Sequence, residues 1–131
     1  MIYVDSCIAI YWVEENPICI EPLRIAFSML PIGDMTYSPL VKLECLVYPY
    51  RQGNSGLIER YQRFFASAVC LSLSDEIFDD AARLRAAYPN LKTPDALHLA
   101  CSQYYSCSAL WTNDDRLYRT VGGYAVNICG K

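Results

Sequence analysis

The sequence predicts a single α/β domain with a mostly parallel central sheet of about five strands and helices on both faces. Short runs of β-branched and aromatic residues alternate with longer stretches of helical period along the chain. Parallel strands need such crossover helices, which then cover both faces of the sheet. The 131 residues suit one domain, 1–131, and no linker, repeat or low-complexity segment divides them.

The alternating runs locate the elements in order along the chain. Strands are expected at Ile2–Val4, Met35–Tyr37, Val69–Leu73, Ala109–Thr112 and Tyr124–Ile128. Helices are expected at about residues 6–13, 21–30, 39–50, 55–67, 75–87 and 94–105.

Three helix starts carry recognisable capping chemistry. Ser38-Pro39 and Thr93-Pro94 each combine a side-chain acceptor for the N-cap with proline at the first helical position. Ser74 supplies an acceptor before two acids, where the helix dipole favours negative charge. We therefore expect Ser38, Thr93 and Ser74 to cap the helices that follow them.

The seven cysteines are odd in number and include neither a C-x-x-C pair nor a partner histidine at zinc-finger spacing. Most lie in apolar runs, which predicts small buried hydrophobes in a reducing compartment, with a zinc or redox site as the alternative. The first residues carry no basic segment, and no apolar run approaches the ~20 residues that cross a bilayer. We expect a cytoplasmic protein without a membrane segment.

Several common catalytic motifs are missing from the sequence. Neither Gly-rich phosphate-binding pattern, GxGxxG or GxxxxGK[ST], occurs, and neither does the nucleophile elbow GxSxG. The single histidine, His98, lies in an apolar helical stretch, which favours a satisfied, partly buried imidazole over a catalytic one. Nucleophilic triads built on histidine therefore have little support.

Four acidic residues stand in apolar surroundings. Asp5 and Asp114 follow predicted strands, and the carboxyl ends of parallel strands are where ligands bind. Asp95 opens a predicted helix, and Glu44 lies in a helix that is apolar almost all round, where an unpaired buried carboxylate would be costly. Three of them also have local explanations: a helix cap for Asp5, a helix-start charge for Asp95 and a turn for Asp114.

Together the four acids predict a cation site. Carboxylates that converge on one pocket repel one another, and a bound cation offsets that repulsion. An all-carboxylate pocket favours a hard ion, Mg²⁺ or in its place Mn²⁺, over zinc. Mg²⁺ held in this way typically acts on phosphates, so the chemical hypothesis is hydrolysis of a phosphodiester bond.

These residues resemble the PIN-domain ribonucleases of the VapC toxin type, from type II toxin–antitoxin systems. The resemblance covers nearly the whole chain. The matching segments are the first strand ending in Asp5, Ser38-Pro39-Leu40 leading to Glu44, Lys92 to Ala100, and Leu110 to Asp114.

The resemblance implies a Mg²⁺-dependent endoribonuclease, usually a homodimer, that acts as a toxin. Its metal centre would consist of Asp5 and Asp95 as principal ligands, with Glu44 and Asp114 completing the shell or holding its waters. The order Thr-Asn-Asp favours Asp114 over Asp115 as the fourth acid. The resemblance also implies a cognate antitoxin that occupies the site.

Other residues near the acids have expected roles. Ser6 and Thr112 would donate hydrogen bonds to the carboxylates. RNA phosphates would be held by Arg85, Lys92 and Arg116, which are near the acids in sequence and otherwise represent ordinary solvated charges. The aromatic residues of two successive predicted helices suit core packing and also a surface for an antitoxin helix; they are Tyr48, Tyr50, Tyr61, Phe64 and Phe65.

The charge balance limits how RNA is held. Eleven basic residues against 14 acidic ones, a net charge of −3, argue against a broad positive surface. Without the four clustered acids, 10 acidic residues remain against 11 basic ones, so substrate should be held locally by metal and a few arginines. Two other functions stay open from the residues alone: a metal-dependent DNA nuclease or phosphatase, and a non-catalytic domain that binds a partner.

Overall fold

Five parallel strands form the central sheet of the computed structural model, which describes residues 1–114, 117 and 124–129. They lie in the order β3-β2-β1-β4-β5. The strands are β1 Ile2–Val4, β2 Met35–Tyr37, β3 Val69–Cys70, β4 Ala109–Thr112 and β5 Ala125–Asn127. The helices are α1 Ser6–Val13, α2 Ile20–Ser28, α3 Pro39–Gln52, α4 Ser55–Ala66, α5 Asp75–Ala87 and α6 Thr93–Tyr104.

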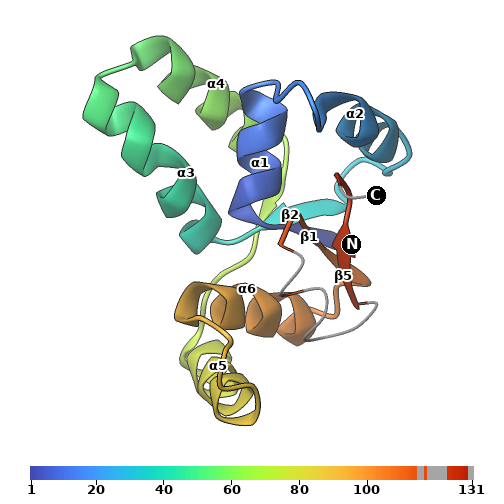
Figure 1. Cartoon of the computed structure of the whole chain (residues 1–131), viewed down its shortest axis with the longest axis vertical. Coiled ribbons are helices and arrows are strands. Elements are labelled where there is room, and N and C mark those ends of the chain that lie inside the picture. Colours follow the sequence, from blue (N-terminus) through green and yellow to red (C-terminus); the bar gives the residue numbers. More distant parts are fainter. Residues whose placement is uncertain (115–116, 118–123, 130–131) are drawn as a thin grey trace.

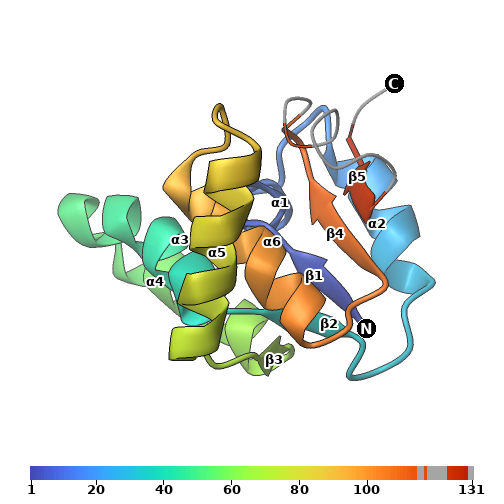
Figure 2. The same cartoon turned by 90° about the horizontal axis from the view of Figure 1, so that it is seen from below.

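Helices cover both faces of the sheet, which confirms the predicted α/β fold. α1 to α4 lie on one face, and α5 and α6 lie on the other (Figure 1, Figure 2). α1 packs against β4 and against α2, α3 and α4, while α6 packs against β4 and α5. Within the described part of the chain, no helix is both long enough and apolar enough to span a membrane.

The most completely buried stretches are β1 and the middle of α6. All three residues of β1 are buried, and so is every residue of α6 from Ala96 to Ser102. A central strand of a parallel sheet is covered on both faces, and α6 lies between the sheet and α5, so both segments are apolar on nearly every side. His98 is a polar exception, and it is only 1% exposed.

The strand order places a topological switch between β1 and β4. From β1 the chain passes outward to β2 and β3, and it then returns to the other side of β1 for β4 and β5. Ligands of open α/β sheets bind at the carboxyl ends of strands beside such a switch. Val4 pairs with Trp111, and the backbone N–H of Asp5 donates to the Trp111 carbonyl at 3.0 Å. Asp5 therefore leaves the sheet beside Thr112.

The helix starts agree with the sequence, and Ser38 and Ser74 hold the expected N-cap positions, but the expected side-chain capping hydrogen bonds do not form. α3 and α5 begin directly after Ser38 and Ser74, yet neither serine makes a capping hydrogen bond. Thr93 is already the first residue of α6, and its Oγ1 accepts a hydrogen bond from Arg85 Nη1 at 2.9 Å. The Ser38 hydroxyl bonds to the Tyr3 hydroxyl at 2.7 Å instead. A tertiary partner has replaced the local one.

The expectation that the cysteines are small buried hydrophobes in a reducing compartment is wrong for part of them, and Cys70, for example, is exposed. Five of the seven are free thiols, but Cys19, ahead of α2, and Cys129, after β5, form a disulfide. The two residues are 110 positions apart in sequence, and their Cα atoms are 5.0 Å apart. Disulfide formation depends on this spatial approach, which no local sequence motif announces.

Removing the disulfide should destabilise the protein. We expect Cys129→Ser to lower the free energy of unfolding by about 2–4 kcal/mol, because the unfolded chain regains the freedom that the long closed loop denies it. Urea unfolding with and without reductant measures the effect. Cys70→Ser is the matched control, because Cys70 is free and exposed. An unfolding midpoint that reductant leaves unchanged would contradict the pairing.

Candidate metal centre

A hollow of about 450 Å³ opens at the carboxyl ends of β1 and β4. All four acids singled out in the sequence line it: Asp5 after β1, Glu44 on α3, Asp95 in the first turn of α6 and Asp114 after β4. The other residues that line it are Ser6, Cys7, Tyr11 and Asn113. Among these eight lining residues, none has a positively charged side chain.

Asp5 is held by several hydrogen bonds to its carboxylate. Its side chain is buried, and its Oδ1 accepts hydrogen bonds from the Ser6 backbone N–H at 2.6 Å and the Ser6 hydroxyl at 3.3 Å. Its Oδ2 accepts a hydrogen bond from Thr112 Oγ1 at 2.9 Å. The same Thr112 oxygen accepts from the Asp114 backbone N–H at 3.0 Å, which orients the hydroxyl. Asp5 is thus both the N-cap of α1 and a fixed wall of the hollow.

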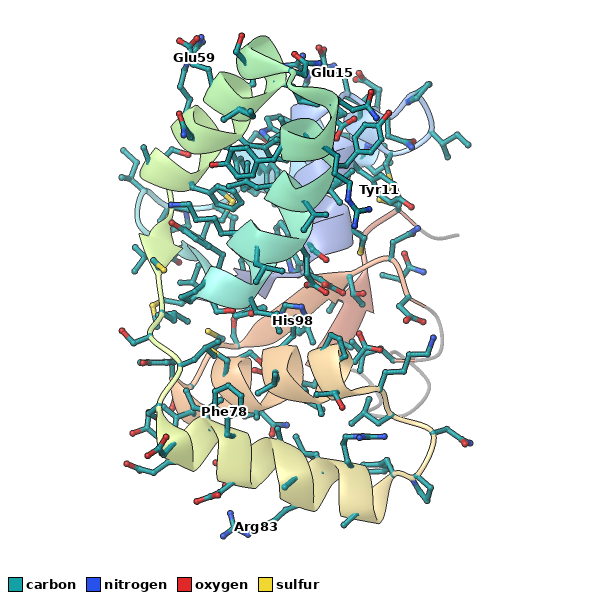
Figure 3. The ribbon with its side chains drawn as sticks, turned by 90° about the vertical axis from the view of Figure 1, so that its left-hand side faces the viewer. Tyr11, Glu15, Glu59, Phe78, Arg83 and His98 are labelled. Carbon is teal, nitrogen blue, oxygen red and sulfur yellow. A yellow bond between two sulfur atoms is a disulfide. The ribbon has the colours of Figure 1, made fainter. Side chains whose placement is uncertain are left out.

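Glu44 is hydrogen-bonded to a residue on the opposite layer of helices. Its side chain is 28% exposed, and its Oε1 accepts a hydrogen bond from His98 Nε2 at 2.7 Å. A carboxylate on this apolar helix was expected to need a polar partner, and the His98 imidazole is that partner. Figure 3 shows His98 between α6 and the layer of helices that contains α1 and α3.

The expectation of a satisfied imidazole at His98 is confirmed in its chemistry, but the burial is complete rather than partial. Its Nδ1 lies 2.7 Å from the Tyr3 hydroxyl, and its Nε2 also lies 3.7 Å from Asp5 Oδ1. Sequence reasoning therefore missed that the partner of His98 is an acid of the site. The available signal was the three-residue spacing of Asp95 and His98, which puts both on one helical face.

The raised pKa of Asp95 shows that negative charges are crowded in the hollow. Burial raises the pKa of its carboxyl group, and the nearby charges of Asp5 and Asp114 raise that pKa further. His98 acts in the opposite direction. Ionised carboxylates in this hollow therefore repel one another, and a cation would relieve the repulsion.

Cys7, Tyr11 and Asn113 form the rest of the wall and were missed from the sequence. Asn113 joins them, because its backbone N–H donates to Cys7 Sγ at 3.3 Å and its Nδ2 donates to the Tyr11 hydroxyl at 3.2 Å. Burial, with the charge of Asp5 adding to it, raises the pKa of the Cys7 thiol to about 12. The thiol therefore stays protonated near neutral pH and is a poor nucleophile.

Arg85 and Lys92, two of the three basic residues expected to hold substrate, are not part of the lining. Arg85 donates to the Leu91 carbonyl and to Thr93 Oγ1, both at 2.9 Å, which ties its guanidinium group to the loop before α6. Lys92 is exposed just before Thr93. Arg116, like Asp115, lies outside the described residues.

The donor atoms fit a hard divalent cation. Four acidic residues line one hollow, and ligand-type atoms of Asp5, Glu44 and His98 lie within 4.8 Å of one another, a group that does not include Asp95 or Asp114. Carboxylate oxygen is the donor that Mg²⁺ and Mn²⁺ prefer, so this set of residues suits such an ion.

The fold is similar to solved structures of toxin–antitoxin proteins. A chain of a toxin–antitoxin complex from Klebsiella pneumoniae has a TM-score of 0.80 at 20% identity, with 98% of each chain covered. VapBC2 from Rickettsia felis, bound to a DNA fragment from their promoter, has a TM-score of 0.77 at 17% identity, with 97% of this chain and 98% of that chain covered. VapC20 from Mycobacterium tuberculosis, a sarcin–ricin loop cleaving toxin, has a TM-score of 0.76 at 12% identity, with 92% of this chain and 95% of that chain covered.

Sequence comparison with curated proteins finds no match. At the identities above, the structural similarity shows the fold alone. A family model described as the PIN domain, however, matches residues 2–123, a span that contains all four acids of the hollow. The chain therefore belongs to the PIN domain family.

Proposed function

We propose that this protein is a Mg²⁺-dependent endoribonuclease, the toxin of a toxin–antitoxin pair, and that Mn²⁺ can replace Mg²⁺. The observation that carries the proposal is the meeting of Asp5, Glu44, Asp95 and Asp114 in one hollow whose described lining contains no basic side chain. Phosphate cannot approach such a surface without a cation, and the hollow lies at the switch point of the sheet, where ligands of this architecture bind.

Asp5 and Asp95 would be the principal ligands of the cation, and Glu44 and Asp114 would complete its shell. When bound, Mg²⁺ supplies polarisation of a phosphoryl oxygen and a water of lowered pKa. The chain itself fixes the Asp5 carboxylate through Ser6 and holds its second oxygen through Thr112. These contacts keep the oxygens in place before any ion or substrate arrives.

Hydrolysis of the phosphodiester adds water across a P–O bond and needs no protein nucleophile. Cys7, with its raised pKa, is unsuited to that role. We propose Lys92 as a contact for RNA phosphate, because it is exposed beside the first turn of α6, three residues before Asp95. Arg85 is already engaged by Leu91 and Thr93, which makes it a weaker candidate, and Arg116 remains a prediction.

RNA as the substrate and toxin as the biological role are supported by family and fold. The neighbour VapC20 is a toxin that cleaves the sarcin–ricin loop, and other neighbours are toxin–antitoxin complexes. We extend both features to this chain and place its action in the cytoplasm, where RNA and a co-expressed antitoxin are available.

An antitoxin and a second copy of the chain are the expected partners. The aromatic cluster foreseen on two helices is divided in the structure, because Tyr61, Phe64 and Phe65 of α4 belong to the core. Tyr48 and Tyr50 on α3 remain exposed. They lie on a helix whose Leu43 and Val47 are also exposed, so α3 offers apolar surface for a partner.

Neutralising either principal ligand should abolish cleavage. We expect Asp5→Asn and Asp95→Asn each to reduce the Mg²⁺-dependent cleavage rate of single-stranded RNA by about 100-fold or more, because each removes a ligand of the ion that stabilises the transition state. Asp79→Asn is the control, since Asp79 is exposed on α5. Full activity in both site variants would contradict the mechanism.

The same assay with other substrates separates the alternatives. Single-stranded DNA and a simple phosphomonoester should be cleaved slowly or not at all. Cleavage of DNA but not RNA would replace the proposed function with a DNA nuclease. Lack of cleavage of every substrate, with a partner protein still bound, would favour the non-catalytic domain.

The crowding of the acids predicts a stability change. In the presence of EDTA, Asp95→Asn should raise the melting temperature by a few degrees, because it removes one charge from a repelling group. Mg²⁺ should raise the melting temperature of the wild-type protein and have less effect on the variant. Thermal denaturation in EDTA and in Mg²⁺, with Asp79→Asn as control, tests both statements. Melting temperatures that respond to neither change would contradict the convergence.

We expect the protein to be a homodimer in solution. Light scattering on the purified protein should give twice the 14.9 kDa of one chain. A monomer at micromolar concentration would contradict the expected homodimer without affecting the catalytic proposal.

A further inference from the structure

We propose that His98 and Tyr3 are positioning residues that aim the Glu44 carboxylate at the hollow through a hydrogen-bond chain anchored at Ser38. The inference deepens the proposed function and rests on it, because it takes Glu44 as a ligand of the cation. It assigns His98 to the support of a ligand, and it does not make His98 a ligand itself.

The chain of contacts is continuous and short. The Ser38 and Tyr3 hydroxyl oxygens are 2.7 Å apart, the Tyr3 hydroxyl is 2.7 Å from His98 Nδ1, and His98 Nε2 is 2.7 Å from Glu44 Oε1. Ser38 directly precedes α3, and Glu44 lies on that helix. The hydrogen-bond chain therefore begins at the start of α3, passes through Tyr3 on β1 and His98 on α6, and ends on α3 at Glu44.

The direction of the last hydrogen bond follows from the acceptor. An ionised carboxylate only accepts, so His98 Nε2 must donate to Glu44. If the ring is neutral, Nδ1 accepts from Tyr3, and Tyr3 accepts from Ser38. If the ring is protonated, Nδ1 donates to Tyr3, and Tyr3 donates to Ser38. Every member has a partner in both cases, so the positioning role does not depend on the charge of His98.

Burial makes the chain rigid. Ser38 and Tyr3 are fully buried, and His98 is 1% exposed, so water cannot readily replace a lost partner. Glu44, in contrast, is partly exposed and carries a flexible side chain. Without His98 its carboxylate would be free to turn toward solvent.

The alternative role for His98 is direct coordination of the cation. Its Nε2 lies near both Asp5 and Glu44, close enough to share an ion with them. Coordination requires a bare Nε2, however, whereas the 2.7 Å approach to Glu44 places a proton there. The two roles thus predict opposite protonation of one nitrogen when the cation binds.

Cation affinity tests the positioning role. Calorimetric titration with Mn²⁺ should show that His98→Leu weakens binding by about 10–100-fold, as expected when the support of a ligand is lost. Tyr3→Phe should weaken Mn²⁺ binding by a few-fold. His98→Gln, whose amide N–H can take the place of Nε2–H, should restore most of the affinity. Ser102→Ala is the matched control, because Ser102 is equally buried on α6 but its hydroxyl bonds to the Leu99 carbonyl.

Spectroscopy tests the same role without any activity assay. His98 is the only histidine of the chain, so the ¹⁵N spectrum of labelled imidazole reports this residue alone. Nε2 should carry a proton in the metal-free protein and keep it when Mg²⁺ is added. Loss of that proton on Mg²⁺ binding would show direct coordination and would overturn the proposal.

The outcomes separate this inference from the proposed function. A wild-type protein that binds no Mn²⁺ and cleaves no RNA would overturn the proposed function and the role of Glu44 together. A wild-type protein that binds Mn²⁺ and cleaves RNA, while Tyr3→Phe and a folded His98→Leu bind Mn²⁺ equally well, would overturn the inference alone. If His98→Leu does not fold, Tyr3→Phe and the ¹⁵N spectrum decide.

Discussion

Repulsion among four carboxylates held in one hollow is the constraint on which the rest of this structure depends. Asp5 and Asp114 meet there because β1 and β4 are parallel neighbours, and Asp95 and Glu44 arrive from helices on opposite faces of the sheet. Folding must bring these like charges together, and the buried surface of the sheet and of α6 has to offset the cost. The hollow is therefore a region that lowers the stability of the fold, and packing elsewhere in the domain offsets that cost.

The elements and the acids were predictable because both follow from local patterns. The alternation of strand-like and helical periods located β1 and α5, for example, to the residue. The convergence of Asp5 and Asp114 was predictable because parallel strands end at one edge. What could not be predicted depends on pairs distant in sequence. Cys19 and Cys129 pair across 110 positions, and the Ser38 hydroxyl bonds to Tyr3 rather than to its own helix.

His98 illustrates how a correct local reading can be incomplete. Its neighbours on α6 are apolar and buried, so a satisfied imidazole in a packed helix was the right description of its surroundings. Its partners, Tyr3 and Glu44, come from other elements, and one of them is an acid of the hollow. Periodicity shows which face of a helix is buried, but it does not show which polar groups of other elements contact that face.

The closed path from Ser38 through Tyr3 and His98 to Glu44 has a consequence for how this sequence varies over evolution. Ser38, Tyr3 and His98 are buried, so replacing one of them leaves its neighbour without a hydrogen-bond partner. Positions 3, 38 and 98 are thus expected to change as a set, with lineages keeping all three polar side chains or exchanging all three for apolar ones. Asp5, Asp95 and Asp114 are subject to a different constraint, because they line the hollow without being members of this buried hydrogen-bond path.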